Sequence, residues 1–198
     1  VMKRNVFEDT SITAMDKLFV CEEAVIKGKP ERLAGQYKAC EFYFDEVDAC
    51  GMDVKGSKLH DIKRCKFQKP NVFEDCEIKK VGFEIFNDYK GAEAVFRKCK
   101  LEDVKFAING RSQNDVKFLV EDCEIHLTKP MIDMWNCTGK GTYHFVNCKI
   151  VADDIAYLCK TSWTDGEYDN YKVIFENCEI VGVKELANTR MKRHVICK

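Results

Sequence analysis

A short pattern of apolar and polar positions recurs along the chain. An apolar residue stands three positions before a cysteine, and another follows two positions after it, in the segments 71–78 (NVFEDCEI), 95–101 (VFRKCKL), 119–125 (LVEDCEI), 144–150 (HFVNCKI) and 174–180 (IFENCEI). Segment 5–12 (NVFEDTSI) repeats the pattern with Thr10 in place of the cysteine. Such internal self-similarity is typical of proteins built from stacked structural units.

The cysteines divide into two registers. The first has intervals of 23 to 30 residues and contains Cys21, Cys50, Cys76, Cys99, Cys123, Cys148 and Cys178. The second lies ten or eleven residues earlier in each case and contains Thr10, Cys40, Cys65 and Cys137. Glu23 departs from the pattern, because it occupies the position two after a cysteine where the other units have an apolar residue. The mean interval of about 26 residues predicts about seven units.

The units are expected to be β-strands. Cys-x-Ile alternates with period two, and the apolar residues are largely Val, Ile and Phe. A unit of this size cannot bury its own apolar face and must stack on its neighbours. We therefore predict an all-β fold, a parallel β-helix of about seven coils with internal ladders of Cys, Phe and Ile or Leu, spaced about 4.8 Å apart. Leucine-rich repeats are the alternative, but the chain has only eight leucines.

Length and charge favour one domain. The 198 residues are 45% hydrophobic, and 32 basic residues balance 33 acidic ones. We expect a single domain over 1–198, with capping coils at 1–30 and 179–198, and the start at Val1 suggests a fragment of a longer chain. The balanced charge argues against nucleic-acid binding. The longest apolar run is shorter than the roughly 18 residues of a membrane span, and no signal peptide is visible.

The twelve cysteines are expected to be free thiols. The closest two are ten residues apart, so no Cys-x-x-Cys motif is present and zinc sites are disfavoured. A disulfide framework is conceivable, but a core of this size does not need one. Buried thiols indicate synthesis in a reducing cytoplasm.

The repeated Phe-x-x-Cys-x-Ile units resemble the right-handed parallel β-helix proteins of the pectin-lyase-like superfamily. The resemblance covers most of the chain and implies a right-handed coil. Members include polysaccharide lyases and hydrolases, phage tailspikes and appendages, and adhesins, so a virion-associated location is one implication. Lyases of this superfamily commonly use acidic calcium ligands and a basic residue that abstracts a proton. No motif here carries those roles onto numbered positions, so we expect no cofactor, and calcium only if the protein is a lyase.

Candidate binding residues lie in the irregular stretch 159–172. Aromatic rings stack on sugar C–H groups while carboxylates accept hydrogen bonds from hydroxyls. This predicts a binding site that contains Trp163, Tyr168, Asp169 and Tyr171. The alternative is a protruding turn that packs its aromatic residues against the coil.

Paired carboxylates are the minimum equipment of a glycosidase. The candidates are Asp165 with Glu167, and Asp154 with its neighbour Asp153, although adjacent residues of a strand point to opposite faces. The four histidines are isolated in sequence, without a metal-binding or catalytic motif.

The sequence is compatible with three functions. The leading hypothesis is a non-catalytic scaffold that binds an extended glycan or a cell-surface protein, as a tailspike or adhesin-like module would. The second is a polysaccharide lyase or glycoside hydrolase. The third is a structural assembly element that forms homo-oligomers through its coil ends.

Overall fold

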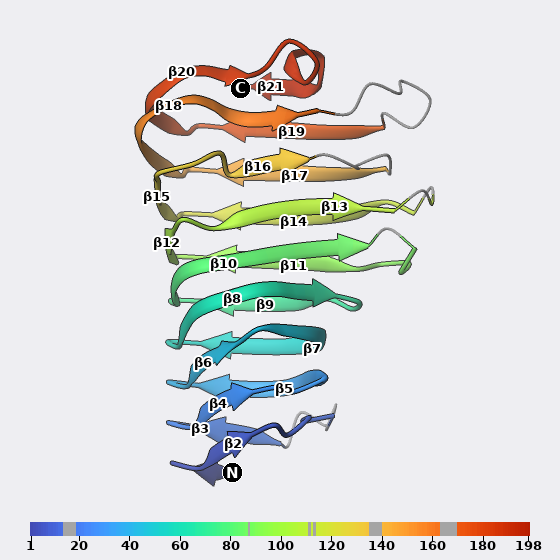
Figure 1. Ribbon diagram of the computed structural model, residues 1–198, viewed down its shortest axis with the longest axis vertical. Helices are drawn as coiled ribbons and strands as arrows, with labels where there is room; N and C mark the ends of the chain where they lie inside the picture. Colours follow the sequence, from blue (N-terminus) through green and yellow to red (C-terminus); the bar gives the residue numbers. More distant parts are fainter. Residues whose placement is uncertain (14–18, 87, 111, 113, 135–139, 163–169) are drawn as a thin grey trace.

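The protein is a rod of stacked parallel strands (Figure 1). The computed structural model describes residues 1–13, 19–86, 88–110, 112, 114–134, 140–162 and 170–198. In these residues 21 strands pair in parallel, and one short 3₁₀ helix, η2 (Lys192–His194), lies near the C-terminal end. The predicted all-β parallel solenoid is confirmed.

Each coil has three faces, defined here by the strands that stack on one another. Face 1 contains β1 (Met2–Lys3), β3 (Val20–Glu22), β9 (Asn71–Glu74), β11 (Glu93–Arg97), β14 (Val116–Glu121), β17 (Gly141–Val146), β19 (Tyr171–Glu176) and β21 (Val195–Cys197). The second halves of β5 (Arg32–Lys38) and β7 (Glu46–Lys55) complete it.

Face 2 is narrow, about three residues wide. It contains β2 (Val6–Glu8), β4 (Val25–Gly28), β6 (Glu41–Phe44), β12 (Lys100–Glu102), β15 (Glu124–Leu127) and the first parts of β8 (Lys58–Phe67), β10 (Glu77–Phe86), β18 (Lys149–Thr161) and β20 (Glu179–Ala187). Face 3 contains β13 (Lys105–Asn109), β16 (Ile132–Met134), the second parts of β8, β10, β18 and β20, and the first parts of β5 and β7.

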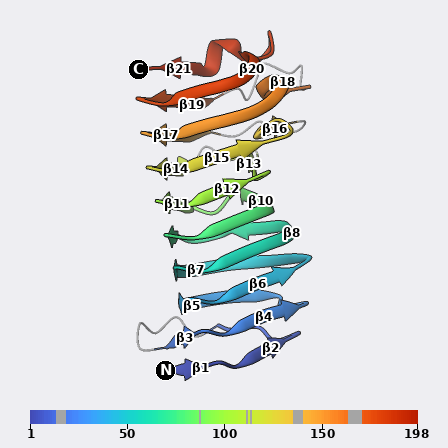
Figure 2. The ribbon, with the colours of Figure 1, turned by 90° about the vertical axis from the view of Figure 1, so that its left-hand side faces the viewer.

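The coil is right-handed. In Figure 1, face 3 runs from left to right in front and face 1 returns behind it, while the chain rises from the N-terminus to the C-terminus. Figure 2 is viewed from the left-hand side of Figure 1. In it the strands of face 2 run from left to right, which is from the back to the front of Figure 1. Parallel strands of one sheet are joined by right-handed crossovers almost without exception, because right-twisted strands return to the sheet only in that sense.

A corner ladder joins face 1 to face 2. Its levels follow from the register of the flanking strands and contain Asn5, Ala24, Cys40, Ser57, Cys76, Cys99, Cys123, Cys148 and Cys178. The residue before each ladder position has a positive φ, between 51° and 56° at Arg4, Asp75 and Asn177, for example. Asp and Asn tolerate this left-handed conformation better than most residues, which explains why they so often precede the cysteine.

The ladder corrects the register predicted for the N-terminal coils. Cys21 and Cys50 do not lie in it, because Cys21 pairs with Tyr37 on face 1 and Cys50 lies within β7. Cys40 and Ser57 take the ladder positions, and the described part of the chain forms nine ladder levels where about seven coils were predicted. The physical reason is that β5 and β7 run from face 3 into face 1 without an intervening loop, so these coils need fewer residues.

Glu23 does not interrupt the interior: it is the positive-φ residue of its corner, with φ 53°, and its carboxylate accepts a hydrogen bond from Arg4 Nε at 2.6 Å. The eleven described cysteines are free thiols, as expected. Cys137, assigned to the second register, lies outside the described residues.

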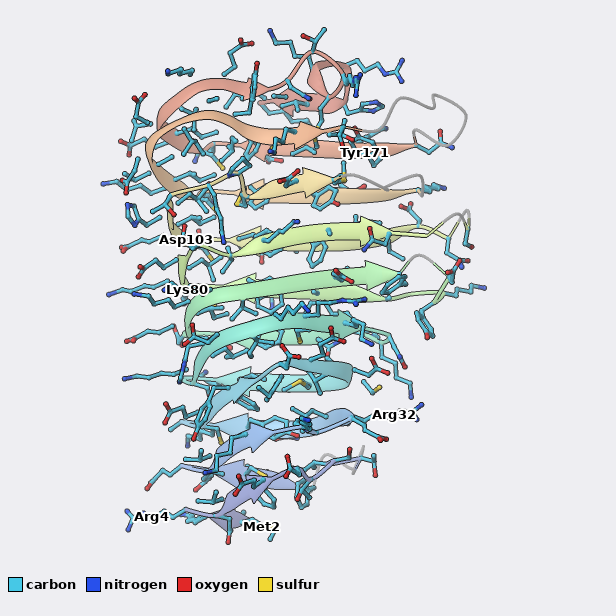
Figure 3. The ribbon with its side chains drawn as sticks, viewed as in Figure 1. Met2, Arg4, Arg32, Lys80, Asp103 and Tyr171 are labelled. Atoms are coloured by element: carbon cyan, nitrogen blue, oxygen red, sulfur yellow. The ribbon has the colours of Figure 1, made fainter. Side chains whose placement is uncertain are left out.

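The core consists of the predicted ladders of large side chains. Phe73, Phe96, Val120, Phe145 and Phe175 stack at successive levels of face 1. The rings of Phe73 and Phe96 lie parallel, with centroids 5.0 Å apart. Phe83 and Phe106, from face 3, fill the space opposite them. All of these side chains are buried. Figure 3 shows corner residues such as Arg4, Lys80 and Asp103 at the edge of the coil. The same column of face 1 continues below Phe73 with Val54, Tyr37 and Cys21, so the N-terminal coils fill their interior with other side chains.

Candidate functional site

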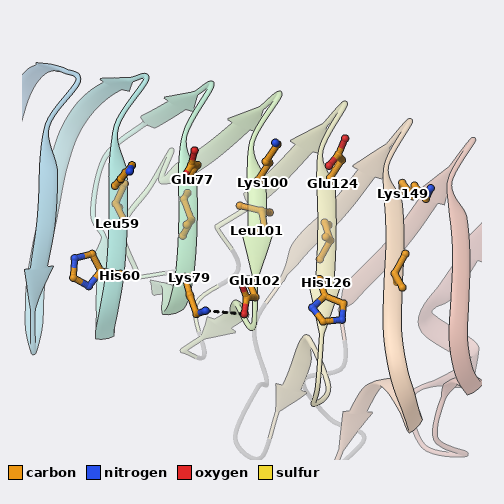
Figure 4. A pocket seen from close by; sticks show the side chains of 14 residues that line it. Leu59, His60, Glu77, Lys79, Lys100, Leu101, Glu102, Glu124, His126 and Lys149 are labelled. Carbon is orange, nitrogen blue, oxygen red and sulfur yellow. Dashed lines mark ion pairs between the residues drawn. The ribbon is translucent and has the colours of Figure 1, made fainter.

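A shallow groove runs along face 2 across five levels, from β8 to β18 (Figure 4). It has a volume of about 740 Å³. Its floor is the main chain of Leu59, Ile78, Leu101 and Ile125, whose side chains are buried in the core. Because face 2 is only about three residues wide, the residue on each side of the floor points outward and two rows of side chains border the groove.

The first row, directly after the corner, alternates in charge. We call six of its members the charge ladder: Lys58, Glu77, Lys100, Glu124 and Lys149 border the groove, and Glu179 extends the row one level further. At the other end Glu41 lies in register with Lys58, but it is paired with His60 at 2.9 Å and is not counted in the charge ladder. All six side chains are exposed. Each ladder residue pairs in register with one of opposite charge, about 4.8 Å away along the rod.

The charge ladder differs from the other charged rows of the rod. On face 1, Arg97 Nε contacts Glu121 Oε2 at 2.7 Å and Lys55 Nζ contacts Glu74 Oε1 at 3.5 Å. Face 3 has a comparable ion pair between Lys66 and Asp48. Among the described residues, no ion pair of 4.0 Å or less involves a member of the charge ladder. Its ammonium and carboxylate groups therefore face solvent instead of closing on one another.

The second row contains His60, Lys79, Glu102, His126 and Val151. Lys79 Nζ lies 3.0 Å from Glu102 Oε1, as Figure 4 shows, and His126 Nε2 lies 2.9 Å from Asp153 Oδ1. His60 lies between two carboxylates, 2.9 Å from Glu41 and 3.0 Å from Asp61. This row is therefore already held by internal contacts.

These contacts change the pKa values of two imidazoles. The hydrogen bond to Asp153, followed by its charge, raises the pKa of His126. Burial lowers the pKa of His60, but hydrogen bonds to Asp61 and Glu41 outweigh it, and the pKa rises. Both histidines therefore gain positive charge more readily than a free imidazole, and they add to the cations beside the groove.

Most residues predicted for the binding or catalytic site lie outside the described residues. These are Trp163, Asp165, Glu167, Tyr168 and Asp169. Tyr171 is described: its side chain is 2% exposed, and its ring stacks on His194 with centroids 4.2 Å apart. Figure 3 places it near the C-terminal end of the rod. Its ring is thus enclosed and is not presented at the surface.

The paired aspartates lie at the corner between faces 2 and 3. Asp153 contacts His126, whereas Asp154 has φ 50° and forms the turn itself. Both are exposed. Asp154 therefore has a conformational reason to be present, because Asp adopts positive φ more readily than most residues.

Three of the buried thiols, Cys21, Cys65 and Cys159, are poorly suited to chemistry. Burial raises the pKa of Cys65 and of Cys159 far above the usual range for a thiol, and that of Cys21 to about 11. A thiol that stays protonated is neither a nucleophile nor a metal ligand. No group of three or more His, Cys, Asp or Glu suited to a metal ion occurs among the described residues, and none of their helices has the length and apolar character to cross a membrane.

The sequence reasoning missed the charge ladder, although a signal was present. From Cys76 onward, the residue directly after each ladder cysteine reads Glu77, Lys100, Glu124, Lys149 and Glu179, which is a strict alternation. The apolar pattern does not reveal this alternation, because Lys and Glu both count as polar positions in it. Comparison with protein-family models, curated proteins and solved structures finds no match to this chain.

Proposed function

We propose that this protein is a non-catalytic β-helix scaffold that binds an extended glycan along the groove of face 2. One observation carries the proposal: an exposed ladder of alternating Lys and Glu whose members make no ion pairs with one another. We also place the chain, as part of the proposal, among pectin-lyase-like β-helix proteins on its repeated Phe-x-x-Cys-x-Ile units.

The chemistry of the groove suits hydroxyl groups. A hydroxyl donates one hydrogen bond and accepts others, and the ladder offers an acceptor at each Glu and donors at each Lys. Hydrogen bonds to charged groups are worth about 1.5–3 kcal/mol each, so a few of them hold a chain lying along the rod. The groove is long and shallow, which fits a linear polymer better than a compact small molecule.

Binding to a panel of linear polysaccharides tests the proposal. The variant Lys100→Gln with Glu124→Gln removes two neighbouring charges at the centre of the groove and keeps the side-chain length. We expect it to bind its glycan at least tenfold more weakly, since about 1.4 kcal/mol corresponds to a factor of ten. Lys105→Gln, an exposed change on face 3, is the matched control and should bind normally.

Two results would count against the proposal. Equal binding by the double variant and by the control would place the glycan elsewhere on the rod. Degradation of any polysaccharide in the panel would favour the alternative of a lyase or hydrolase, and the acids at 165 and 167 would then be the first to replace.

A further inference from the structure

The charge ladder has the repeat of a β-sheet stack. Its charges recur about every 4.8 Å, the distance between hydrogen-bonded strands. An extended peptide presents same-face residues at about twice 3.3 Å and falls out of step with the ladder within a few residues. A second parallel β-helix has the same repeat and stays in step along the full length.

We propose that two copies of this chain pair side by side and antiparallel, with their charge ladders in contact. A two-fold axis that lies in the interface along the strand direction reverses the rod and keeps each row opposite itself. With this axis between the levels of Lys100 and Glu124, Lys100 faces Glu124 of the other copy. By the same symmetry Glu77 faces Lys149, and Lys58 faces Glu179. Six ion pairs of opposite charge result.

The second row is compatible with this arrangement. The same axis places Glu102 opposite His126 of the other copy, and the raised pKa of His126 keeps its imidazole cationic to higher pH. Lys79 then faces Val151, so no like charges meet in this row. Moving the axis by half a level, onto a ladder residue, would place Lys100 opposite Lys100 and Glu77 opposite Glu124. Such like-charge contacts are destabilising, and the alternation therefore specifies the register.

The interface is small. The ladder from Lys58 to Glu179 spans five steps, or about 24 Å, and the face is only three residues wide. The buried area therefore falls at the low end of the range for specific complexes. Screening reduces the attraction between exposed charges, because the Debye length shortens from about 10 Å at 0.1 M salt to about 3 Å at 1 M. The pair is expected to dissociate at high salt.

The pairing uses the same groove as the proposed glycan binding, but it depends on the order of the charges rather than on their hydrogen-bonding capacity. The two occupants would compete for the groove. The molar mass in solution tests the pairing, and glycan affinity tests the proposed function. One of the two proposals can therefore fail while the other holds.

Light scattering after size exclusion, at low ionic strength and over a concentration series, tests the pairing. The wild type should approach twice the chain mass of 22.9 kDa, and Lys105→Glu, the control on face 3, should do the same. Lys100→Glu alone and Glu124→Lys alone should each be monomers, because each creates two like-charge contacts across the axis. Mixing these two variants should restore the dimer, since Glu at 100 then faces Lys at 124.

Three outcomes would overturn the proposal: a wild type that is monomeric throughout, dimers that persist in both single variants, or variants that fail to pair when mixed. Failure of the mixed variants to pair is also what a parallel arrangement of the two rods would give, because Lys100 would then face the second row of the other copy. If circular dichroism shows either variant unfolded, Glu77→Lys and Lys149→Glu repeat the test at another pair of the same interface.

Discussion

The Sγ atom of Cys99 lies 3.5 Å from the carbonyl oxygen of Phe73, 26 residues earlier in the chain and one coil below. It also lies 3.3 Å from the carbonyl oxygen of Arg97 in its own coil. At its cysteine levels the corner ladder therefore holds a small side chain with a weak donor that reaches two carbonyl groups. Ser57 occupies an equivalent level, and its hydroxyl donates to the carbonyl of Lys55 at 3.0 Å.

Replacement of Cys99 should depend on size more than on sulfur. Cys99→Ser keeps a donor of similar size and should lower the free energy of unfolding by about 1 kcal/mol or less. Cys99→Leu adds carbon atoms to a closed stack and should cost about 1–3 kcal/mol. Urea unfolding monitored by circular dichroism measures both. A serine variant less stable than the leucine variant would contradict this account.

Phe96 is the central ring of the core, fully buried and within 5.0 Å of the ring centroids of both Phe73 and Phe83. We expect Phe96→Ala to cost about 3–5 kcal/mol, because it removes buried surface and leaves a cavity. The adjacent outward change Arg97→Ala breaks only an exposed ion pair with Glu121 and should cost about 1 kcal/mol or less. Similar chemical-denaturation midpoints for the two variants would be inconsistent with a continuous ring stack.

Gly182 turns the chain from face 2 to face 3 with φ 81°, and a Cβ there would collide with the main chain of Ala152 in the coil below. Gly182→Ala should therefore destabilise the C-terminal coils by more than the roughly 1–3 kcal/mol of left-handed strain alone. Gly56→Ala is the matched control, since its φ is 56° and no atom lies within 4 Å of the added carbon. In thermal unfolding, the midpoint temperature should fall clearly more for Gly182→Ala than for Gly56→Ala.

The contact between His126 and Asp153 should make stability depend on pH. The folded-state pKa of His126 is raised, so its contribution is fully present below the unfolded value of about 6.5 and disappears as pH rises through the folded value. Titration of the imidazole by NMR should show an elevated pKa that returns toward about 6.5 in Asp153→Asn. An unchanged pKa in that variant would show that the contact does not form in solution.

Thiol labelling should follow burial. Cys197 is exposed and should react first with iodoacetamide, and Cys50, which is half-buried, should follow. Cys65 and Cys159 are enclosed, with raised pKa values, and should react only when denaturant opens the coil. Peptide mass spectrometry reads each site separately. Rapid native labelling of Cys65 would contradict the packing described for face 3.

The repeated apolar positions predicted the fold class and the ladders of Phe and Ile, because both depend on local alternation and on residue size. The free thiols were predicted from the spacing of the cysteines and the size of the core. Glu23 shows where such reasoning failed. In the sequence it replaces an apolar residue, but in the structure it supplies the left-handed turn of a corner. The spacing of two residues in the sequence includes every residue between them. The register of the strands depends only on those that follow the path around the rod, and not on residues in loops.

The sequence by itself determined that the chain must stack, since no unit of about 26 residues can bury its own apolar face. Only the tertiary structure decided which residues share a level, because coils with and without loops return to the same corner after different numbers of residues. It also decided that Lys100 and Glu124, separated by 24 positions, stand side by side in one exposed row. Charged residues that are distant in the sequence form one row on the surface only when the backbone places them at a common spacing.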